Sequence, residues 1–239
     1  MMNPEIPPAE APPTELTPTE MTFLIGSDLL ALADIADPTI LRAANAIKAD
    51  VYFMYRGERM ENTMALGAYV LMGGFLALLN EGAISLRYVE TKKLRVLKSH
   101  HVMVEKVGDS SYAPPTIEGG LFQGVSRSAP LSVKQVVGKW FGPHVEDPGE
   151  VAYGPAWDRL VSLGMIVLED VPTGKKGKLK AVPRPNMELI AQVVPQLVSW
   201  SERWIKFGVE EAELSQHLLS EIKRTLSWKE KTENDDSDW

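Results

Sequence analysis

The sequence predicts a mainly α-helical fold with two small β-hairpins, arranged as a compact helical domain with winged-helix-like units. Three features support this fold class: one long uncharged segment, several capped segments with apolar residues at helical spacing, and two pairs of short β-branched segments. The chain has 239 residues, of which 44% are hydrophobic and 24% are charged. This composition is typical of a globular protein that buries a core.

The segment from Thr63 to Leu79 contains no charged residue and admits three interpretations: a membrane span, a phosphate-binding glycine loop, or a core helix. Its length is at the lower limit for crossing a bilayer, and it is flanked by acidic rather than basic residues. The pair Gly73-Gly74 lacks the lysine and serine of a phosphate loop. We therefore expect a buried helix whose glycines let neighbouring helices approach closely.

A first structural unit is expected over residues of about 37–107. Asp37 is a typical N-cap and Pro38 a typical first helical residue. Apolar residues then recur at helical spacing as far as Met54. After the uncharged segment, residues 83–107 contain short alternating or β-branched runs, which predict a β-hairpin.

A second unit follows. Ser132 and Gln135 have the spacing of a capping box, in a helix that should end at Gly142. A loop is expected next, then a helix over residues 156–164 and a hairpin over residues 165–183. Helix, helix, hairpin is the element order of a winged helix, and the first unit repeats part of it, which suggests a tandem arrangement.

The last predicted helix runs from about Val209 to Trp228 and has a narrow apolar stripe. The residues of this stripe are Leu214, Leu218, Ile222 and Leu226. A narrow stripe next to Gly208 is typical of a detachable helix, so we expect it to cover the core or bind a partner.

Composition also predicts the domain boundaries. Residues 1–19 are rich in proline and glutamate and residues 229–239 are acidic, so both are expected to be disordered tails. A single mainly helical domain, residues 20–228, is expected between them. Its parts are the two units, about 37–107 and 130–185, and helices over 186–228.

The formal net charge is −7, yet basic residues are concentrated on the two hairpins. They are Arg87, Lys92, Lys93, Arg95 and Lys98 on the first hairpin, and Lys175, Lys176, Lys178, Lys180 and Arg184 on the second. If both hairpins lie on one side, they form a positive face for a membrane lipid headgroup, nucleic acid or an acidic protein partner. The alternative is that lysines at strand edges only prevent aggregation.

No arrangement of residues indicates catalysis or a metal site. Cysteine is absent, and the adjacent residues His100 and His101 would point to opposite faces of a strand. His144 and His217 have no carboxylate or serine at the spacing of a catalytic triad. We therefore expect a non-enzymatic protein with no catalytic residues, no metal and no cofactor.

Five segments occur in a recognisable order: "GGFLALLNEGAISL", a basic hairpin, "SVKQVVGKWFG", "RLVSLGMIVLED" with a second hairpin, and a helix after "VPRPN". Over residues of about 64–207 this order resembles the Golgi phosphoprotein family, which includes the eukaryotic Golgi phosphoinositide adaptor and bacterial relatives. The resemblance implies a mostly helical fold around a central apolar helix, phosphoinositide binding and peripheral attachment to membranes. At the headgroup positions of that family this chain has Asn62, Leu71, Glu150 and Tyr153, so no headgroup residue is carried over.

Together these observations predict a non-enzymatic binding or adaptor protein, cytoplasmic and peripheral to a membrane through its basic hairpins. The alternative is a tandem winged-helix protein that binds DNA or acts as a subunit of a protein assembly. Liposome flotation and a DNA shift assay separate these two functions.

Overall fold

The computed structural model describes residues 15–56, 58–93, 97–142, 145–172 and 179–236. These residues form nine helices and three small antiparallel sheets, and 60% of the structure is helical. The helices are α1 (Pro18–Gly26), α2 (Leu29–Leu32), α3 (Pro38–Val51), α4 (Thr63–Asn80), α5 (Ile117–Gly124), α6 (Val133–Phe141), α7 (Pro148–Ser162), α8 (Met187–Glu210) and α9 (Ala212–Asp236). The strands are β1 (Tyr52–Tyr55), β2 (Glu58–Glu61), β3 (Ile84–Lys93), β4 (Leu97–Lys106), β5 (Leu131–Ser132), β6 (Ile166–Pro172) and β7 (Leu179–Pro185).

The prediction of two β-hairpins is wrong, because a third small sheet forms between α3 and α4. In this sheet β1 pairs antiparallel with β2, and Tyr52 lies opposite Glu61. Helix α3 ends at Val51, and the backbone N–H of Asn62 donates to the Val51 carbonyl as the chain returns. The aromatic run Tyr-Phe-Met-Tyr of β1 favours a strand over a further helical turn.

The predicted winged-helix-like units are also absent from the described part of the chain. A winged helix needs the strand before its second helix to join the hairpin of the same unit. Here β5, which precedes α6, pairs instead with β4 of the first hairpin. The strands β6 and β7 form a two-stranded sheet of their own. The order of elements in the sequence therefore does not produce the sheet that would define a wing.

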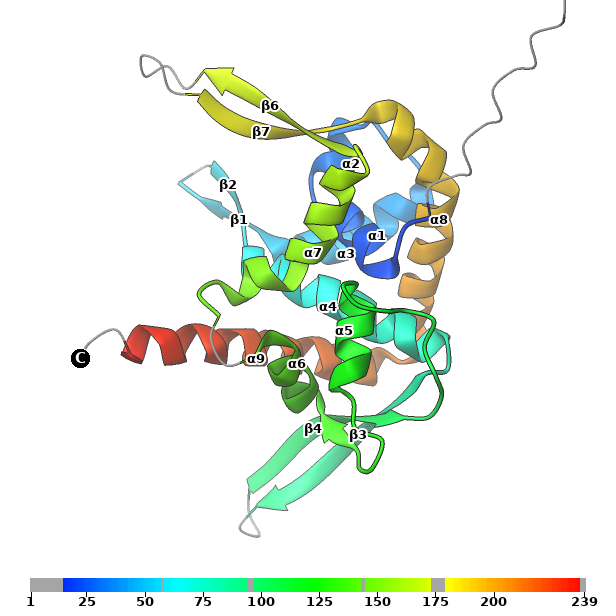
Figure 1. Cartoon of the computed structure of the whole chain (residues 1–239), viewed down its shortest axis with the longest axis vertical. Coiled ribbons are helices and arrows are strands. Elements are labelled where there is room, and N and C mark those ends of the chain that lie inside the picture. Colours follow the sequence, from blue (N-terminus) through cyan, green and yellow to red (C-terminus); the bar gives the residue numbers. More distant parts are fainter. Residues whose placement is uncertain (1–14, 57, 94–96, 143–144, 173–178, 237–239) are drawn as a thin grey trace, which may run out of the picture.

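The prediction of a buried helix over residues 63–79 is confirmed by α4. This helix lies at the centre of the molecule, and α1, α3, α5, α7 and α9 pack around it (Figure 1). Among the described residues it is the one helix long and apolar enough to cross a membrane, and 78% of that segment is buried inside the fold. Its glycines lie at close contacts: a Cβ on Gly67 would be 2.6 Å from the carbonyl oxygen of Gly149 in α7.

Helix ends follow their local capping signals. The carboxylate of Asp37 caps α3, and Ser132 and Gln135 form the reciprocal hydrogen bonds of a capping box on α6. Gly142 ends α6 with φ 74°, and Gly164 follows α7 with φ 70°, a conformation that favours glycine. These predicted boundaries are confirmed.

Two other boundaries differ from the prediction. Helix α7 begins at Pro148, eight residues before the predicted start at 156, inside a segment interpreted as a loop. Asp147 caps it by accepting a hydrogen bond from the backbone N–H of Glu150. Helix α8 continues through Gly208 to Glu210, so the last helix begins at Ala212 and not at about Val209 as predicted.

The predicted tails are too long. Leu16 is buried, and Thr17 and Glu20 form a capping box at the start of α1, so the chain is part of the fold from Leu16 onward. At the other end α9 continues to Asp236. The rest of the two predicted tails, residues 1–14 and 237–239, lies outside the described residues.

Candidate functional site

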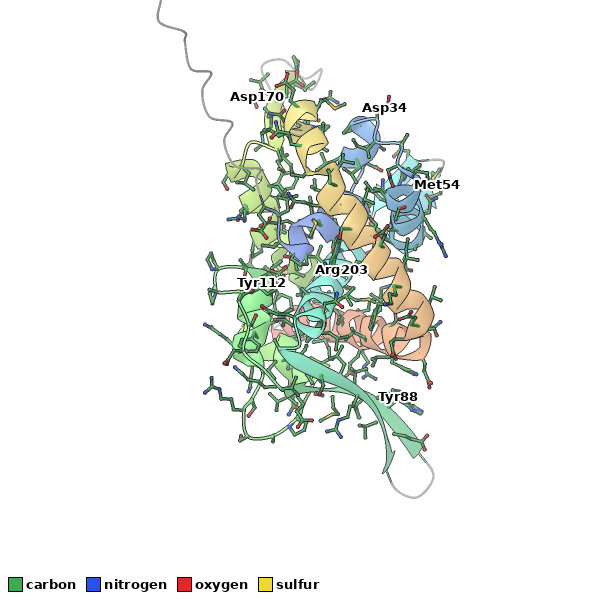
Figure 2. The ribbon with its side chains drawn as sticks, turned by 90° about the vertical axis from the view of Figure 1, so that its right-hand side faces the viewer. Asp34, Met54, Tyr88, Tyr112, Asp170 and Arg203 are labelled. Atoms are coloured by element: carbon green, nitrogen blue, oxygen red, sulfur yellow. The ribbon has the colours of Figure 1, made fainter. Side chains whose placement is uncertain are left out.

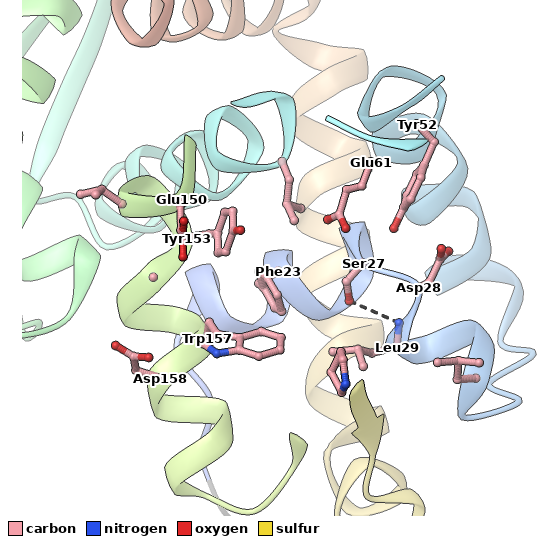
Figure 3. A pocket seen from close by; sticks show the side chains of 15 residues that line it. Phe23, Ser27, Asp28, Leu29, Tyr52, Glu61, Glu150, Tyr153, Trp157 and Asp158 are labelled. Carbon is pink, nitrogen blue, oxygen red and sulfur yellow. Dashed lines mark hydrogen bonds between the residues drawn. The ribbon is translucent and has the colours of Figure 1, made fainter. Parts of the chain in front are cut away.

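A cavity of about 680 Å³ lies between α1, α2, the β1–β2 hairpin, α7 and β7. Figure 3 shows two facing walls, with Glu150, Tyr153 and Trp157 on one side and Asp28, Tyr52 and Glu61 on the other, while Asp158 lies at the edge, on the outer side of α7. Phe23 and Ser27 lie between the two walls (Figure 3). The volume is within the range of sites that bind small molecules or a protruding side chain.

Aromatic side chains form the apolar part of the cavity. Tyr153 and Trp157 are four residues apart in α7 and therefore lie on the same helix face. The buried ring of Phe23 packs against both, with ring centroids 5.5 Å from Tyr153 and 5.8 Å from Trp157. Tyr52 lies on the opposite wall. The faces of such rings carry partial negative charge and attract cations.

Carboxylates form the polar part. Four of them line the cavity: Asp28, Glu61, Glu150 and Asp158. Lys48 and Arg59 both contact the same oxygen of Asp28, at 3.4 Å and 3.3 Å. The guanidinium of Arg59 also lies 3.7 Å from the ring centroid of Tyr52. Since the described residues lining the cavity include no lysine or arginine, negative charge is in excess there.

Two pKa values reflect this excess. Burial raises the pKa of Glu61, and the charge of Asp28 raises it further, against the opposing effect of Arg59. Burial, together with the charges of Glu150 and Glu61, raises the pKa of Tyr153 to about 12. A raised acid pKa means that negative charge is costly at that position. A cation placed in the cavity would lower this cost.

The chemistry of the cavity suits an organic cation. The described part of the chain contains no group of three or more histidine, aspartate or glutamate side chains arranged to hold a metal ion. An ammonium or guanidinium group, in contrast, forms charge-assisted hydrogen bonds with carboxylates and stacks on aromatic faces. The cavity offers both kinds of contact at once.

The basic hairpins do not form one positive face. Figures 1 and 2 place the β6–β7 hairpin at one end of the long axis and the β3–β4 hairpin at the other. Arg87 pairs with Glu105 at 3.1 Å, and Arg184 pairs with Glu169 at 3.2 Å. The condition for a shared positive face, that both hairpins lie on one side, is therefore not met, and two of the predicted cations are paired within their own hairpins.

The structure says less about the other basic residues of the two hairpins. Lys180 lies on β7 opposite Val171. For Lys92 and Lys93 of β3 and Lys98 of β4 the structure describes the backbone but not the side chains. The other predicted basic residues lie outside the described residues; they are Arg95, Lys175, Lys176 and Lys178.

The predicted partner stripe on the last helix belongs to the core. Leu218, Ile222 and Leu226 are fully buried, and Leu214 is half-buried. They lie on α9, which packs against α4, α6 and β4. The expectation of a detachable helix is therefore corrected, because the apolar stripe is already covered by this chain.

The two adjacent histidines point to opposite faces of β4, as expected. The ring of His100 stacks on Tyr88, with centroids 5.4 Å apart, and His217 of α9 stacks on the same tyrosine at 4.2 Å. The Nδ1 atom of His101 lies 3.7 Å from the buried carboxylate of Glu221. The two rings therefore have separate surroundings and do not face one site.

A second cavity, of about 530 Å³, lies beside a buried pair of carboxylates. Glu20 lines this cavity, and its Oε1 is 2.7 Å from Nε of Arg159. Glu118 accepts a hydrogen bond from the backbone N–H of Thr19 at 2.8 Å, and its other oxygen has no hydrogen-bond partner in the described structure. Burial raises the pKa of Glu118 and raises that of Glu20 to about 7, against the hydrogen bond from Thr17 and the charge of Arg159.

The raised pKa of Glu20 predicts a pH-dependent stability. The folded protein holds this proton up to about pH 7, whereas the unfolded chain releases it near its ordinary pKa of 4.5. The contribution of Glu20 to the free energy of unfolding should therefore fall by roughly 2–4 kcal/mol as the pH rises between these values. Urea unfolding at pH 4.5 and pH 8 measures this change in the free energy of unfolding. The change should be absent in Glu20→Gln and should persist in the control variant Glu105→Gln. An identical pH dependence in wild type and Glu20→Gln would show that Glu20 is ionised throughout.

Comparison with known proteins gives no assignment: no family model, curated protein or solved structure matches this chain. The resemblance to the Golgi phosphoprotein family therefore stays a prediction.

Sequence reasoning did not find the cavity. Its lining residues come from segments as far apart as Phe23 and Pro183, and no short motif connects them. One local signal was available: Asp147-Pro148 repeats the N-cap pattern of Asp37-Pro38 and would have predicted α7. That helix would have placed Tyr153 and Trp157 on one face.

Proposed function

We propose that the protein is a non-enzymatic binding protein of the adaptor type, whose cavity receives one organic cation, an ammonium or a guanidinium group. One observation supports this most: four carboxylates and four aromatic rings surround a single cavity, while Lys48 and Arg59 both contact only one of these carboxylates, Asp28.

The carboxylates and the aromatic rings have separate roles in binding. The carboxylates of Glu61 and Asp158 accept charge-assisted hydrogen bonds, each of which contributes about 1.5–3 kcal/mol. The ring of Trp157 contributes roughly 0.5–2 kcal/mol by contact with the cation. Phe23, packed against Tyr153 and Trp157, keeps these rings in place.

This proposal changes the partner expected from the sequence. The described strands of the two hairpins lie at opposite ends of the molecule, so we assign the partner to the cavity rather than to a surface shared by both hairpins (Figure 1). The alternative of a tandem winged-helix protein loses its basis, because β5 pairs with β4 and leaves β6–β7 without a third strand in the described residues. The cavity instead selects for positive charge in the partner.

Calorimetric titration with N-acetylarginine amide and its neutral isostere N-acetylcitrulline amide tests the proposal. We expect the arginine compound to bind with a Kd on the order of 1 mM, a value typical of a ligand of this size, and the citrulline compound not to bind detectably. Glu61→Gln and Asp158→Asn should each weaken binding roughly tenfold or more. Binding should also weaken as the pH falls, starting above the ordinary carboxyl range, because protonation of Glu61 removes the charge that attracts the ligand.

Glu105→Gln is the matched control, since it removes an exposed carboxylate on the β3–β4 hairpin, at the far end of the molecule (Figure 1). It should leave the affinity unchanged. Equal affinities for the charged and neutral compounds, or equal losses in Glu61→Gln and Glu105→Gln, would contradict the proposal.

A further inference from the structure

Exposed apolar side chains lie in the lining of the acidic cavity and on the two hairpins that contribute Tyr52 and Pro183 to that lining. We call this set the apolar rim: Leu32, Met54, Val151, Leu168 and Leu179. Their exposed fractions range from 42% for Val151 to 67% for Met54. Leu32 and Val151 line the cavity directly. Large exposed apolar side chains gathered around one opening are typical of a surface that binds a partner.

Strand register shows that the other rim residues face the same way. Met54 is two residues from Tyr52 on β1, so its side chain lies on the strand face that carries the cavity residue Tyr52. On the second hairpin Leu168 lies opposite Pro183, which lines the cavity. Leu179 is four residues from Pro183 and shares its face. Both hairpins therefore turn apolar side chains toward the cavity.

Both hairpins also have open edges. In the described part of the chain β1 pairs with β2 alone and β6 pairs with β7 alone. In Figure 1 the two hairpins project from the same side of the body, both to the left of α7. An open strand edge offers backbone N–H and C=O groups to an extended segment, which is a common mode of peptide recognition.

We infer that the occupant of the cavity is a partner protein segment in extended conformation, with one arginine or lysine flanked by apolar residues. The basic side chain enters the cavity that Glu61 and Asp158 line, and the flanking side chains lie on the apolar rim. This inference rests on the proposed function and adds the class of ligand. A small free amine would use the carboxylates and rings but would leave the rim exposed.

Charge favours a foreign segment over a second copy of this chain. The protein carries a net charge of −7, so two copies repel each other at long range. In the described hairpins Arg87 and Arg184 pair with Glu105 and Glu169, and are not available to enter a cavity of another copy. A basic, apolar segment of another protein is complementary to the cavity in both charge and apolar character.

Selection of peptides from a random phage-display library against the full chain tests this inference. The selected peptides are then measured against variants of the cavity and variants of the apolar rim. We expect the selected peptides to share one arginine or lysine between apolar residues. Replacing that residue by norleucine, or the cavity residue Glu61 by glutamine, should weaken the best peptide roughly tenfold or more. Met54→Ser and Leu168→Ser, both exposed and so tolerant of change, should also weaken the peptide roughly tenfold, and should leave the affinity for N-acetylarginine amide unchanged.

The two proposals fail in different ways. If N-acetylarginine amide binds but no peptide depends on the rim residues, the extended segment is wrong and the cation site stands. If neither the amide nor any basic peptide binds, both proposals are wrong. Self-association that disappears in Met54→Ser and Leu168→Ser would assign the rim to a second copy of this chain and overturn the inference.

Discussion

A chain that ends at Glu211, and so lacks α9, is expected to lose its cooperative thermal unfolding transition. Leu218, Ile222 and Leu226 are each 0% exposed, and burying three such side chains contributes together about 5–9 kcal/mol. This is comparable with the whole stability of an ordinary domain, about 5–15 kcal/mol. The deletion would also remove the Glu221 carboxylate, which accepts the backbone N–H of Val102 in β4 at 2.7 Å.

Circular dichroism against temperature measures this loss. A graded pair of full-length variants supports the interpretation: Ile222→Ala should cost about 2–5 kcal/mol of unfolding free energy, whereas Ser220→Ala, on the exposed side of α9, should change it by less than about 0.5 kcal/mol. If the truncated chain melts cooperatively near the wild-type temperature, this expectation is contradicted, and α9 is the detachable helix expected from the sequence.

Substitution of Gly67 by leucine is expected to destabilise the protein by about 3 kcal/mol or more, the upper end of the range for overpacking. A Cβ at this position would lie 2.6 Å from the Gly149 carbonyl oxygen and 2.8 Å from the Ala152 Cβ. The Gly149 oxygen belongs to the backbone of α7, which cannot rotate away like a side chain. The two helices would therefore have to separate.

Gly138→Leu is the matched control. Gly138 is also helical, in α6, but a Cβ there would have no atom within 4 Å outside its own helix. It should be neutral or stabilise the protein by up to about 1 kcal/mol, because glycine disfavours helix interiors. Denaturant unfolding gives both values, and equal effects at the two positions would show that α4 and α7 are not in close contact at Gly67.

Local signals were sufficient wherever one short segment decides the structure. The uncharged run predicted α4, because a helix with apolar residues on all sides must be buried. The caps at Asp37 and Ser132 and the glycines at 142 and 164 fixed helix ends, because each satisfies or ends a helix terminus within a few residues.

Competing local signals explain the errors. Met54 continues the helical spacing of α3, yet the aromatic residues of β1 and pairing with β2 favour a strand from Tyr52. The segment Thr17-Pro18-Thr19-Glu20 has the spacing of a capping box, but its prolines and glutamate have the composition of a tail. In the same way proline and glycine concealed the start of α7 at Pro148.

The sequence did not predict how segments far apart in the chain are placed relative to one another. Whether two basic hairpins share a side depends on the packing of every helix between them, and they lie at opposite ends (Figures 1 and 2). The cavity likewise requires Asp28, Glu61 and Asp158, from three distant segments, to line one space. No local sequence pattern predicts which distant segments line the same cavity, so the acidic cavity is visible only in the folded structure.

A crystal structure of the protein soaked with N-acetylarginine amide tests the cation site most directly. The account predicts the guanidinium inside the cavity, within about 3 Å of carboxylate oxygens of Glu61 or Asp158 and against the ring of Trp157. The same soak of a Glu61→Gln, Asp158→Asn crystal should leave the cavity without the compound. An empty cavity in the wild-type crystal at a saturating concentration, or a guanidinium bound only elsewhere on the surface, would contradict the account.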